Sequence, residues 1–354
     1  MSTTDSAVRH TTLQAQEDRV LMKHGAGGRA MRRLIEETLA AGFADMEVDG
    51  VGLSAFDDGA ALRIGDQWLV VTTDSHVVQP TFFPGGDIGR LSVAGTVNDL
   101  AMMGATEPLA LTCAVILEEG YPRAQLERVH ASMLEAAREA GVPIVTGDTK
   151  VMGRGEIDGI VLNTTGLALT RTVVRDAGLR VGDRIIVTGT IGDHGIALMA
   201  ARRGFGLDAD LRSDVAPLNS LIRAALAAAP GAVTAMKDPT RGGMASALHE
   251  MAEKSGVGIL VEEALVPISD VVRATAEILG LDPFHIANEG KAILGVAPES
   301  ADAVLAALRA HPLGSAAAII GECTAEHARQ IVLDTGFGRR LLAEPEGEPL
   351  PRIC

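Results

Sequence analysis

The strongest constraint on the fold is the way in which strand-like and helix-like segments alternate along the chain. Short apolar runs such as RIIVTG and AAIIGEC are separated by segments whose apolar residues recur at helical spacing. This alternation predicts an α/β or α+β architecture of helices layered on sheets, and it leaves the strand order open. A length of 354 residues corresponds to roughly two domains.

The polar segment RDAGLRVGD separates two sets of alternating elements, so we expect a domain boundary near Ala177. In the first set we predict a hairpin turning at Gly65 and Asp66, a strand over 109–117 and helices over 88–103 and 123–140. The predicted parts are an N-terminal extension with a glycine-rich loop, an N-terminal α/β domain, a C-terminal α+β domain and a flexible tail. They span residues 1–44, 45–176, 177–343 and 344–354.

The tail, EPEGEPLPRIC, ends in Cys354. Its three prolines fix φ and remove backbone donors, so we predict an extended, mobile tether rather than a helix. At roughly 3.3 Å per residue, Cys354 could move on the order of 35–40 Å from Ala343. A thiol on such a tether could visit more than one place.

Composition limits the classes of molecule that the chain can bind and the cellular compartment in which we expect it. A formal net charge of -15 and an aromatic content of 3% argue against nucleic-acid binding. The polar N-terminus has no secretory signal, and no apolar run reaches the ~18 residues of a membrane span. Cys113, Cys323 and Cys354 form no CxxC pair, which suits the reducing cytoplasm and excludes a cysteine zinc site. Because Cys113 and Cys323 lie in apolar runs, we expect them to be buried and inert.

Carboxylates recur beside small residues where we expect strands or helices to end. Hard oxygen ligands at such turns suit Mg²⁺ bound to a polyphosphate. A single aspartate beside glycine is an ordinary turn former, whereas five such motifs in one chain favour a site. The candidates are Asp57 and Asp58, Asp74, Asn98 and Asp99, Asp148, and Asp238.

Lysine is rare in this chain and concentrates in turns. Only Lys254 lies on an ordinary helix end, and the other four lysines lie in glycine- or aspartate-rich segments. A compact ammonium group suits phosphate and proton chemistry. The four are Lys23, Lys150, Lys237 and Lys291.

Two glycine loops that lead into helices present backbone N–H groups to an anion. One contains Gly27 and Gly28, and the other contains Arg241. Neither matches the P-loop pattern or GxGxxG, so a nucleotide would be held by another fold. His24, beside the first loop, could contact phosphate or cap a turn.

Several of these motifs occur together in one known family. DDGA at 57–60, TTDSHVV at 72–78, TGDTKV at 146–151, DPTRGG at 238–243 and NEGK at 288–291 join GGDIGRLSVAGTVNDLAMMGA, GTIGDHG and the PRIC ending. The combination closely resembles the HypE family, the carbamoyl dehydratases of [NiFe]-hydrogenase maturation. That family belongs to an ATP-dependent superfamily with aminoimidazole ribonucleotide synthetase, selenophosphate synthetase and thiamine-monophosphate kinase. The resemblance spans nearly the whole chain after about Val20, and Ala26 in the glycine run is its one small departure.

The resemblance implies an N-terminal sheet domain that pairs with a second copy in a homodimer and a C-terminal domain that closes over ATP. It implies that a partner, HypF, places a carbamoyl group on Cys354. ATP then drives dehydration to a thiocyanate, and the cyano group passes to iron on a HypC–HypD scaffold. By the same resemblance, Lys150 and Glu289 lie nearest the modified sulfur. The Mg²⁺ and phosphate ligands would be Asp57, Asp58, Asp74, Asp99 and Asp238.

Two alternatives stay open at this point. The chain could be another ATP-dependent synthetase or kinase of the same superfamily, or a non-catalytic carrier that uses its terminal thiol for docking. The glycine loop lacks the cysteine or selenocysteine of selenophosphate synthetases, and a kinase has no use for the PRIC tail. The acidic motifs favour an enzyme over a carrier.

Overall fold

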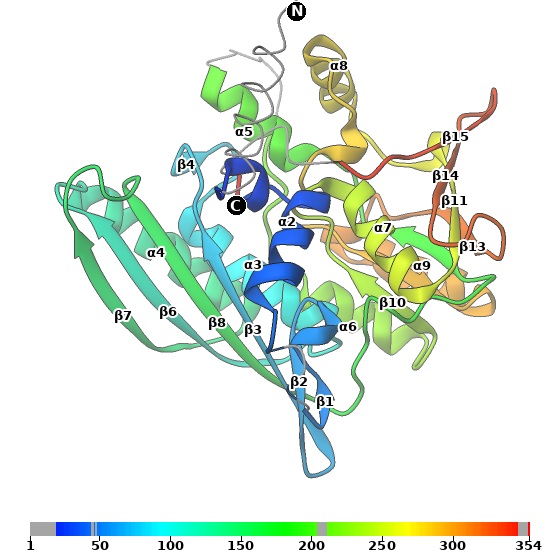
Figure 1. The fold of residues 1–354 in the computed structure, drawn as a ribbon, viewed down its shortest axis with the longest axis horizontal. Coiled ribbons are helices and arrows are strands. Elements are labelled where there is room, and N and C mark those ends of the chain that lie inside the picture. Colours follow the sequence, from blue (N-terminus) through cyan, green and yellow to red (C-terminus); the bar gives the residue numbers. More distant parts are fainter. Residues whose placement is uncertain (1–18, 44–45, 47, 204–210, 346–352) are drawn as a thin grey trace, which may run out of the picture.

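The computed structural model describes residues 19–43, 46, 48–203, 211–345 and 353–354. Two sheets of mixed connectivity, each covered by helices, make up most of the molecule (Figure 1). The predicted mixture of α/β and α+β layers is therefore correct. Within the described residues, no helix has the length and apolar character needed to cross a membrane.

The first sheet has six strands in the order β1-β2-β3-β8-β6-β7. All neighbours are antiparallel except β6 and β7, and Ile64 pairs with Gln67 across the predicted two-residue turn. The bounds are β1 (Gly50–Val51), β2 (Ala60–Ile64), β3 (Gln67–His76), β6 (Pro108–Glu118), β7 (Ile144–Met152) and β8 (Ile160–Thr170).

Helix α3 (Ile88–Met102) packs against β3 and β8, and α4 (Arg123–Ala140) packs against α3. Both helices lie where the apolar periodicity predicted them. Asp87 caps α3, because its Oδ1 accepts from the N–H groups of Gly89 and Arg90. The helix is buried on nearly all sides, so it fixes the first sheet relative to the rest of the molecule.

The second sheet has seven strands in the order β10-β12-β9-β13-β11-β14-β15. Its successive residues face opposite layers: Ile185 and Val187 join the apolar cluster under α7, whereas Ile186 joins the cluster under α6 and α9. The strands are β9 (Arg184–Val187), β10 (Val233–Lys237), β11 (Gly258–Glu262), β12 (Ile293–Val296), β13 (Ala318–Thr324), β14 (Ile331–Asp334) and β15 (Arg339–Leu341). The helices are α5 (Asp193–Arg203), α6 (Asn219–Ala228), α7 (Gly243–Ser255), α8 (Asp270–Leu279) and α9 (Ala301–Ala310).

Short elements complete the chain. Helix α2 (Gly28–Leu34) lies between the two sheets in the view of Figure 1. A two-stranded ribbon, β4 (Phe82–Phe83) with β5 (Gly86–Asp87), precedes α3. The remaining single turns are η1 (Met22–Gly25), η2 (Ile35–Leu39), η3 (Leu53–Ala55), η4 (Glu263–Leu265), η5 (Pro283–His285), η6 (Pro298–Ser300) and η7 (Pro312–Gly314).

The predicted extension and tail are described only in part. The first 18 residues, and residues 346–352 of the predicted tether, lie outside the described residues. Glu344 and Pro345 are described at the root of the tail, and Ile353 and Cys354 at its tip. The division into domains near Ala177 stays a prediction.

Candidate active site

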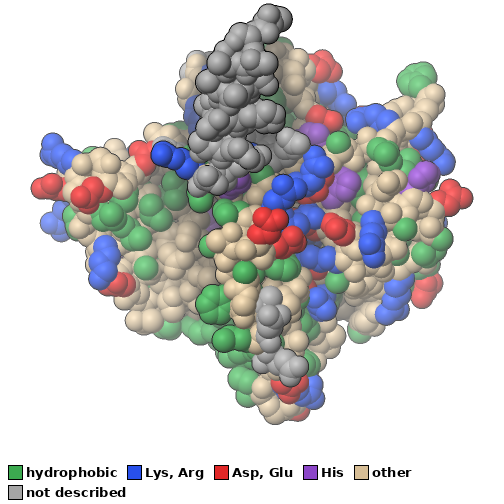
Figure 2. Space-filling view, in the orientation of Figure 1, with side chains coloured by type: hydrophobic (Ala, Val, Ile, Leu, Met, Phe, Trp, Pro, Cys, Tyr) green, Lys and Arg blue, Asp and Glu red, His purple; other side chains and the backbone are tan. Residues whose placement is uncertain are grey.

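A pocket of about 680 Å³ lies between α2, η3, the end of β10 and α7. Gly27 and Gly28 line one wall, and Lys237, Asp238 and Arg241 line another. A Cβ on Gly27 would lie 2.8 Å from the backbone carbon of Arg241, so only glycine allows the two loops to approach this closely. The two predicted glycine loops thus meet at one pocket. Figure 2 shows acidic and basic side chains gathered over the junction of α2 and α7.

Four of the predicted aspartates lie close together, and one of them, Asp238, lines this pocket. Burial raises the pKa of Asp99 well above its usual range, and the charges of Asp74, Asp238 and Asp58 raise it further. Burial, together with Asp58, raises the pKa of Asp238 to about 8. These carboxyls therefore form one acidic cluster, which we define as Asp58, Asp74, Asp99 and Asp238. Asp74 lies in β3 and Asp99 in α3, whereas Asp58 precedes β2 and Asp238 follows β10.

Asp57 lies beside this cluster but is already engaged. Its Oδ2 accepts from Arg175 Nε at 3.0 Å, and its Oδ1 accepts from the N–H of Asp176 at 3.3 Å. Asp57 therefore fastens the segment after β8 to the start of β2. Its predicted role as a ligand stays a prediction.

Two lysines neutralise part of the acidic charge. Lys237 Nζ contacts Asp58, lies 3.3 Å from Glu250 and 3.8 Å from Asp176. Burial would lower the pKa of Lys237, but the nearby carboxylates outweigh burial and raise the pKa well above its usual range. Lys254 donates to Asp176 and to the carbonyl of Phe56, and it lines the pocket. Lys254 lies at the end of a helix, as predicted, because it is in the last turn of α7, and from there it reaches the segments that precede β2 and follow β8.

Glu289 is buried deep in the NEGK loop. Its exposed fraction is 3%, and burial, followed by the charges of Asp238, Asp214 and Asp74, raises its pKa well above the usual range. The backbone N–H of Glu289 donates to Asp214 Oδ1 at 3.0 Å. Its Oε1 is buried and has no hydrogen-bond partner among the described residues. A buried carboxyl of this kind tends to hold its proton, and it is a strong base once it loses that proton.

The side chain of Asn98 is hydrogen-bonded to backbone groups of two other segments. Its Nδ2 donates to the carbonyls of Ala216 and Glu289 at 3.2 and 3.1 Å, and its Oδ1 accepts from the N–H of Leu218 at 2.7 Å. The side chain therefore joins α3 to the NEGK loop and to the segment before α6. Its predicted contact with the nucleotide stays a prediction.

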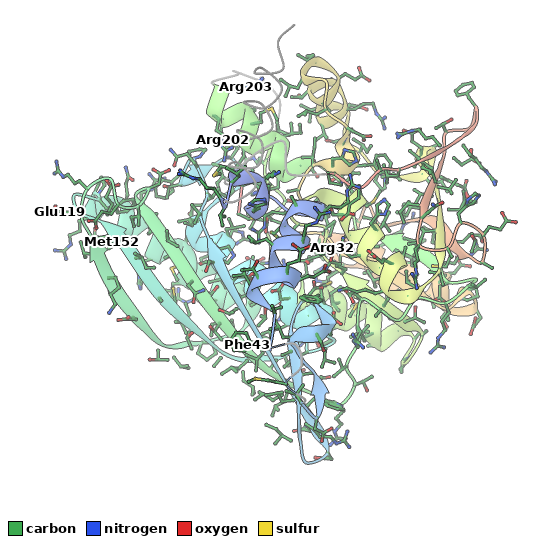
Figure 3. The ribbon with its side chains drawn as sticks, viewed as in Figure 1. Arg32, Phe43, Glu119, Met152, Arg202 and Arg203 are labelled. Atoms are coloured by element: carbon green, nitrogen blue, oxygen red, sulfur yellow. The ribbon has the colours of Figure 1, made fainter. Side chains whose placement is uncertain are left out.

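Lys150 and Asp148 are not brought to the acidic cluster within one chain. Both lie on β7, whose residues are all exposed, and Lys150 Nζ is 3.1 Å from Asp148 Oδ2. Strands β6 and β8 separate β7 from the Asp74 strand. Figure 3 shows Met152, at the end of β7, at the margin of the molecule.

The expectation that Asp74 and Asp148 lie where strands end is wrong, because both lie inside strands. For Asp148 the misleading signal is Gly147. A Cβ there would lie 1.9 Å from the carbonyl oxygen of Cys113, so this glycine allows β7 to pair closely with β6 rather than forming a turn.

His24 caps a turn in this structure. Its Nδ1 accepts from the N–H of Leu21 at 3.0 Å, and it is not among the residues that line the pocket. The prediction that Cys113 and Cys323 are buried is confirmed.

The tail is held at its root and at its tip. At the root, Arg32 of α2 pairs with Glu344 at 2.5 Å and with Glu253 of α7 at 2.6 Å. Figure 3 shows Arg32 on α2, on the side of the second sheet. At the tip, Ile353 is buried and Cys354 packs against the same apolar cluster. The carbonyl of Ile353 accepts from His194 Nε2 at 2.7 Å.

The donor set fits a divalent cation that arrives with phosphate. Within the parts of the chain that the structure describes, no three acidic, histidine or cysteine side chains are already arranged to hold a metal. The acidic cluster nonetheless offers oxygens of the right kind, and Asp58 Oδ2 is buried without a hydrogen-bond partner among them. Mg²⁺ takes few protein carboxylates when phosphate supplies the other ligands.

Two covered sheets with an acidic, lysine-lined pocket between them define a two-domain synthetase fold. Family models agree: residues 56–170 match "AIR synthase related protein, N-terminal domain" and residues 180–334 match the corresponding C-terminal domain. The chain is 47% identical over 346 residues to "Carbamoyl dehydratase HypE" of Cupriavidus necator, covering 97% of each chain. The chain therefore belongs to the AIR synthase related family and, within it, to the HypE carbamoyl dehydratases.

Solved structures give the same family. A crystal structure of HypE in complex with ATP is 44% identical, with a TM-score of 0.78 over 95% of this chain and 100% of that one. A crystal structure of a HypE–HypF complex is 42% identical, with a TM-score of 0.82 over 88% of this chain and 99% of that one. The predicted resemblance is confirmed.

Proposed function

We propose that this chain uses ATP to dehydrate a carboxamide carried on the sulfur of Cys354. The thiocyanate formed would supply the cyanide ligands of [NiFe]-hydrogenase iron. The position of the tail tip carries this proposal: Ile353 is buried and bonded to His194, which neighbours Asp214, the residue that holds Glu289. A protein that only handed over a thiol would have no reason to bury the preceding residue against the segment that also holds the NEGK loop.

The chemistry asks for phosphoryl transfer followed by elimination. The γ-phosphoryl group of ATP is transferred to the carboxamide oxygen, which is otherwise a poor leaving group. Cleavage of the C–O bond then releases phosphate, and loss of both N–H protons leaves the S–C≡N group, with ADP as the other product. Phosphoryl transfer needs positioning and charge neutralisation more than covalent help, and the backbone of Gly27 and Gly28 with Lys237 and Arg241 suits that need. Glu289 is our candidate acceptor of an N–H proton.

We propose that the acidic cluster holds the magnesium ion. Mg²⁺ would neutralise charge on the triphosphate when bound. Asp58 is the strongest candidate ligand, because Lys237 engages one of its oxygens and the other has no hydrogen-bond partner within the described part of the chain. The raised pKa values of Asp99 and Asp238 support the same assignment, because a cation would relieve their repulsion.

We propose that the chain acts as a homodimer through its first sheet. Exposed apolar side chains lie on this sheet, among them Leu62, Ile64, Val145 and Val151. Lys150 and Asp148 lie on the exposed edge strand β7, which also carries Val145 and Val151. Since β6 and β8 separate them from the Asp74 strand, any role for Lys150 in the reaction requires the site of a second copy.

The partner proteins follow from the tethered thiol. We propose a HypF-type carbamoyltransferase as the donor, which the HypE–HypF complex of a relative supports. A HypC–HypD scaffold is the proposed acceptor of the cyano group. A cytoplasmic location belongs to the same proposal and rests on the sparse cysteine pattern of the sequence.

Mass spectrometry of the C-terminal peptide tests the proposal. After incubation with the carbamoyltransferase and then ATP, the peptide ending in Cys354 should first gain a carbamoyl group and then lose one water. Cys354→Ala should bind ATP and give neither product. A carbamoylated tail that stays unchanged with ATP would refute the dehydratase, and it would favour the carrier.

A further inference from the structure

The histidine of the GDHG motif, His194, is buried completely and both of its ring nitrogens are bonded. Nδ1 lies 2.7 Å from Ser213 Oγ, and Nε2 lies 2.7 Å from the carbonyl oxygen of Ile353. The ring also packs edge-on against Phe83, with centroids 5.5 Å apart. The most buried histidine of the described residues is thus hydrogen-bonded to the residue next to the terminal cysteine.

The chemistry of the partners fixes the direction of each bond. A carbonyl oxygen can only accept, so Nε2 of His194 carries the hydrogen. Ser213 Oγ accepts from the N–H of Val215 at 3.1 Å, which leaves its hydroxyl hydrogen for Nδ1. Burial lowers the pKa of His194, in keeping with a neutral ring. Ser213 therefore selects the tautomer that can hold the tail.

The side chain of Ile353 supports the same contact. It is 1% exposed and belongs to an apolar cluster that includes Phe83, Leu198, Val215 and Ala287. Cys354 packs against this cluster from the outside. The tail tip is thus held by one apolar side chain and by one directed hydrogen bond.

The segment that carries Ser213 also carries the loop of Glu289. Asp214 accepts from the N–H of Glu289 at 3.0 Å and pairs with Lys291 at 3.2 Å. A Cβ on Gly290 would lie 1.9 Å from the carbonyl oxygen of Asp214, so the loop and the segment are in direct backbone contact. A movement of the residues that hold Ile353 would therefore also move the loop that carries the buried carboxyl of Glu289.

We propose that His194 is a positioning residue that seats the C-terminal tail, holding the Ile353 carbonyl so that the sulfur of Cys354 stays beside the NEGK loop. Ser213 sets its tautomer, and residues 211–218 join the seat to Glu289. The inference rests on the proposed function only in treating Cys354 as the reacting thiol.

Alkylation of Cys354 in the full-length protein tests the seat without carbamoylation or ATP. Iodoacetamide should label Cys354 about twofold to fivefold faster in His194→Phe, because loss of the hydrogen bond to the tail raises the fraction of released tails. His194→Gln, which keeps an amide donor near the position of Nε2, should fall between this variant and the parent. Buried Cys113 and Cys323 give an internal reference for global opening.

His311 offers a matched control, because its ring also bonds a serine hydroxyl, that of Ser220, and a backbone group, the N–H of Leu313. His311→Phe should leave the labelling of Cys354 unchanged. If His194→Phe does not fold, Ile353→Ala tests the same seat from the tail and should also speed labelling.

The rate of dehydration separates a seat from a purely structural role. Single-turnover water loss from the carbamoylated tail should fall in proportion to the loss of docked tails, with ATP affinity unchanged. Unchanged labelling in folded His194→Phe or Ile353→Ala would overturn the proposal, even if the melting temperature fell. Faster labelling without any cyano product in the parent would instead refute the proposed function and leave the seat intact.

Discussion

Asp238→Asn should stabilise the nucleotide-free protein while destroying its activity. Asp238 is 6% exposed, and burial with the charge of Asp58 raises its pKa from 3.8 to about 8. The folded protein therefore holds a proton that the unfolded chain has already lost between pH 4 and pH 8. Because the folded state binds the extra proton, stability falls as the pH rises through that window.

The size of the effect follows from the same numbers. Between the ordinary pKa of 3.8 and pH 7, the unfolded chain gains about 1.4 kcal/mol for each pH unit, or about 4 kcal/mol in all. An amide does not reproduce every contact of the protonated carboxyl, so the gain should be smaller. We expect Asp238→Asn to add ~1–3 kcal/mol to the free energy of unfolding at pH 7.

Thermal unfolding without nucleotide at pH 5, 7 and 8.5 measures this prediction. The parent should lose stability across the series more steeply than Asp238→Asn, and the difference between the two should be smallest at pH 5. Asp66→Asn, in the exposed turn between β2 and β3, is the matched control and should follow the parent. A variant that is less stable than the parent at pH 8.5, or equally steep, would refute the account of the acidic cluster.

Three further predictions concern the NEGK loop, the second copy and ATP. Gly290→Ala should cost ~1–3 kcal/mol of stability, since its Cβ would lie 1.9 Å from the Asp214 carbonyl oxygen, whereas Gly25→Ala, with nothing within 4 Å, should cost little; urea unfolding compares them. Lys150→Ala and Cys354→Ala should each be inactive, yet co-expression should restore about a quarter of the activity, because half of the randomly paired dimers contain one complete site. No recovery would contradict a role for Lys150 across the dimer. ATP at a hundred times its dissociation constant should stabilise Cys354→Ala by about 2.7 kcal/mol, and no rise in melting temperature would contradict an intact nucleotide site.

Local periodicity was enough to predict the elements that frame the site. The helices expected over 88–103 and 123–140 are α3 and α4, because a long amphipathic repeat leaves few competing structures. The turn at Gly65 and Asp66 was equally local. The convergence of Asp58, Asp74, Asp99 and Asp238 is different, since no spacing rule joins residues from two sheets, and it was expected only from the family resemblance.

The contacts that sequence reasoning missed are all distant in the chain. Lys254 reads as a helix-end lysine, yet its partners Phe56 and Asp176 are 198 and 78 residues away. His194 shows no nearby partner in sequence, because its bonds reach Ser213, 19 residues away, and Ile353, 159 residues away. Side chains that join a helix to a distant loop or to the tail leave no periodic signal. The lysine count alone hinted at Lys237.

The free energy gained by docking the tail tip is close to the free energy lost by ordering it, as suits a sulfur that must both dock and be released. Burying the Ile353 side chain contributes about 1.5–3 kcal/mol, and its hydrogen bond to His194 about 1 kcal/mol. Ordering the backbone of the last two residues costs about 1–2 kcal/mol each. The sum lies within about 2 kcal/mol of zero, so docked and released tips would both be populated. A stronger seat would keep the thiol from its donor, and without the His194 bond the released tip would dominate. The single buried hydrogen bond is therefore the contact through which sequence changes would tune the exchange.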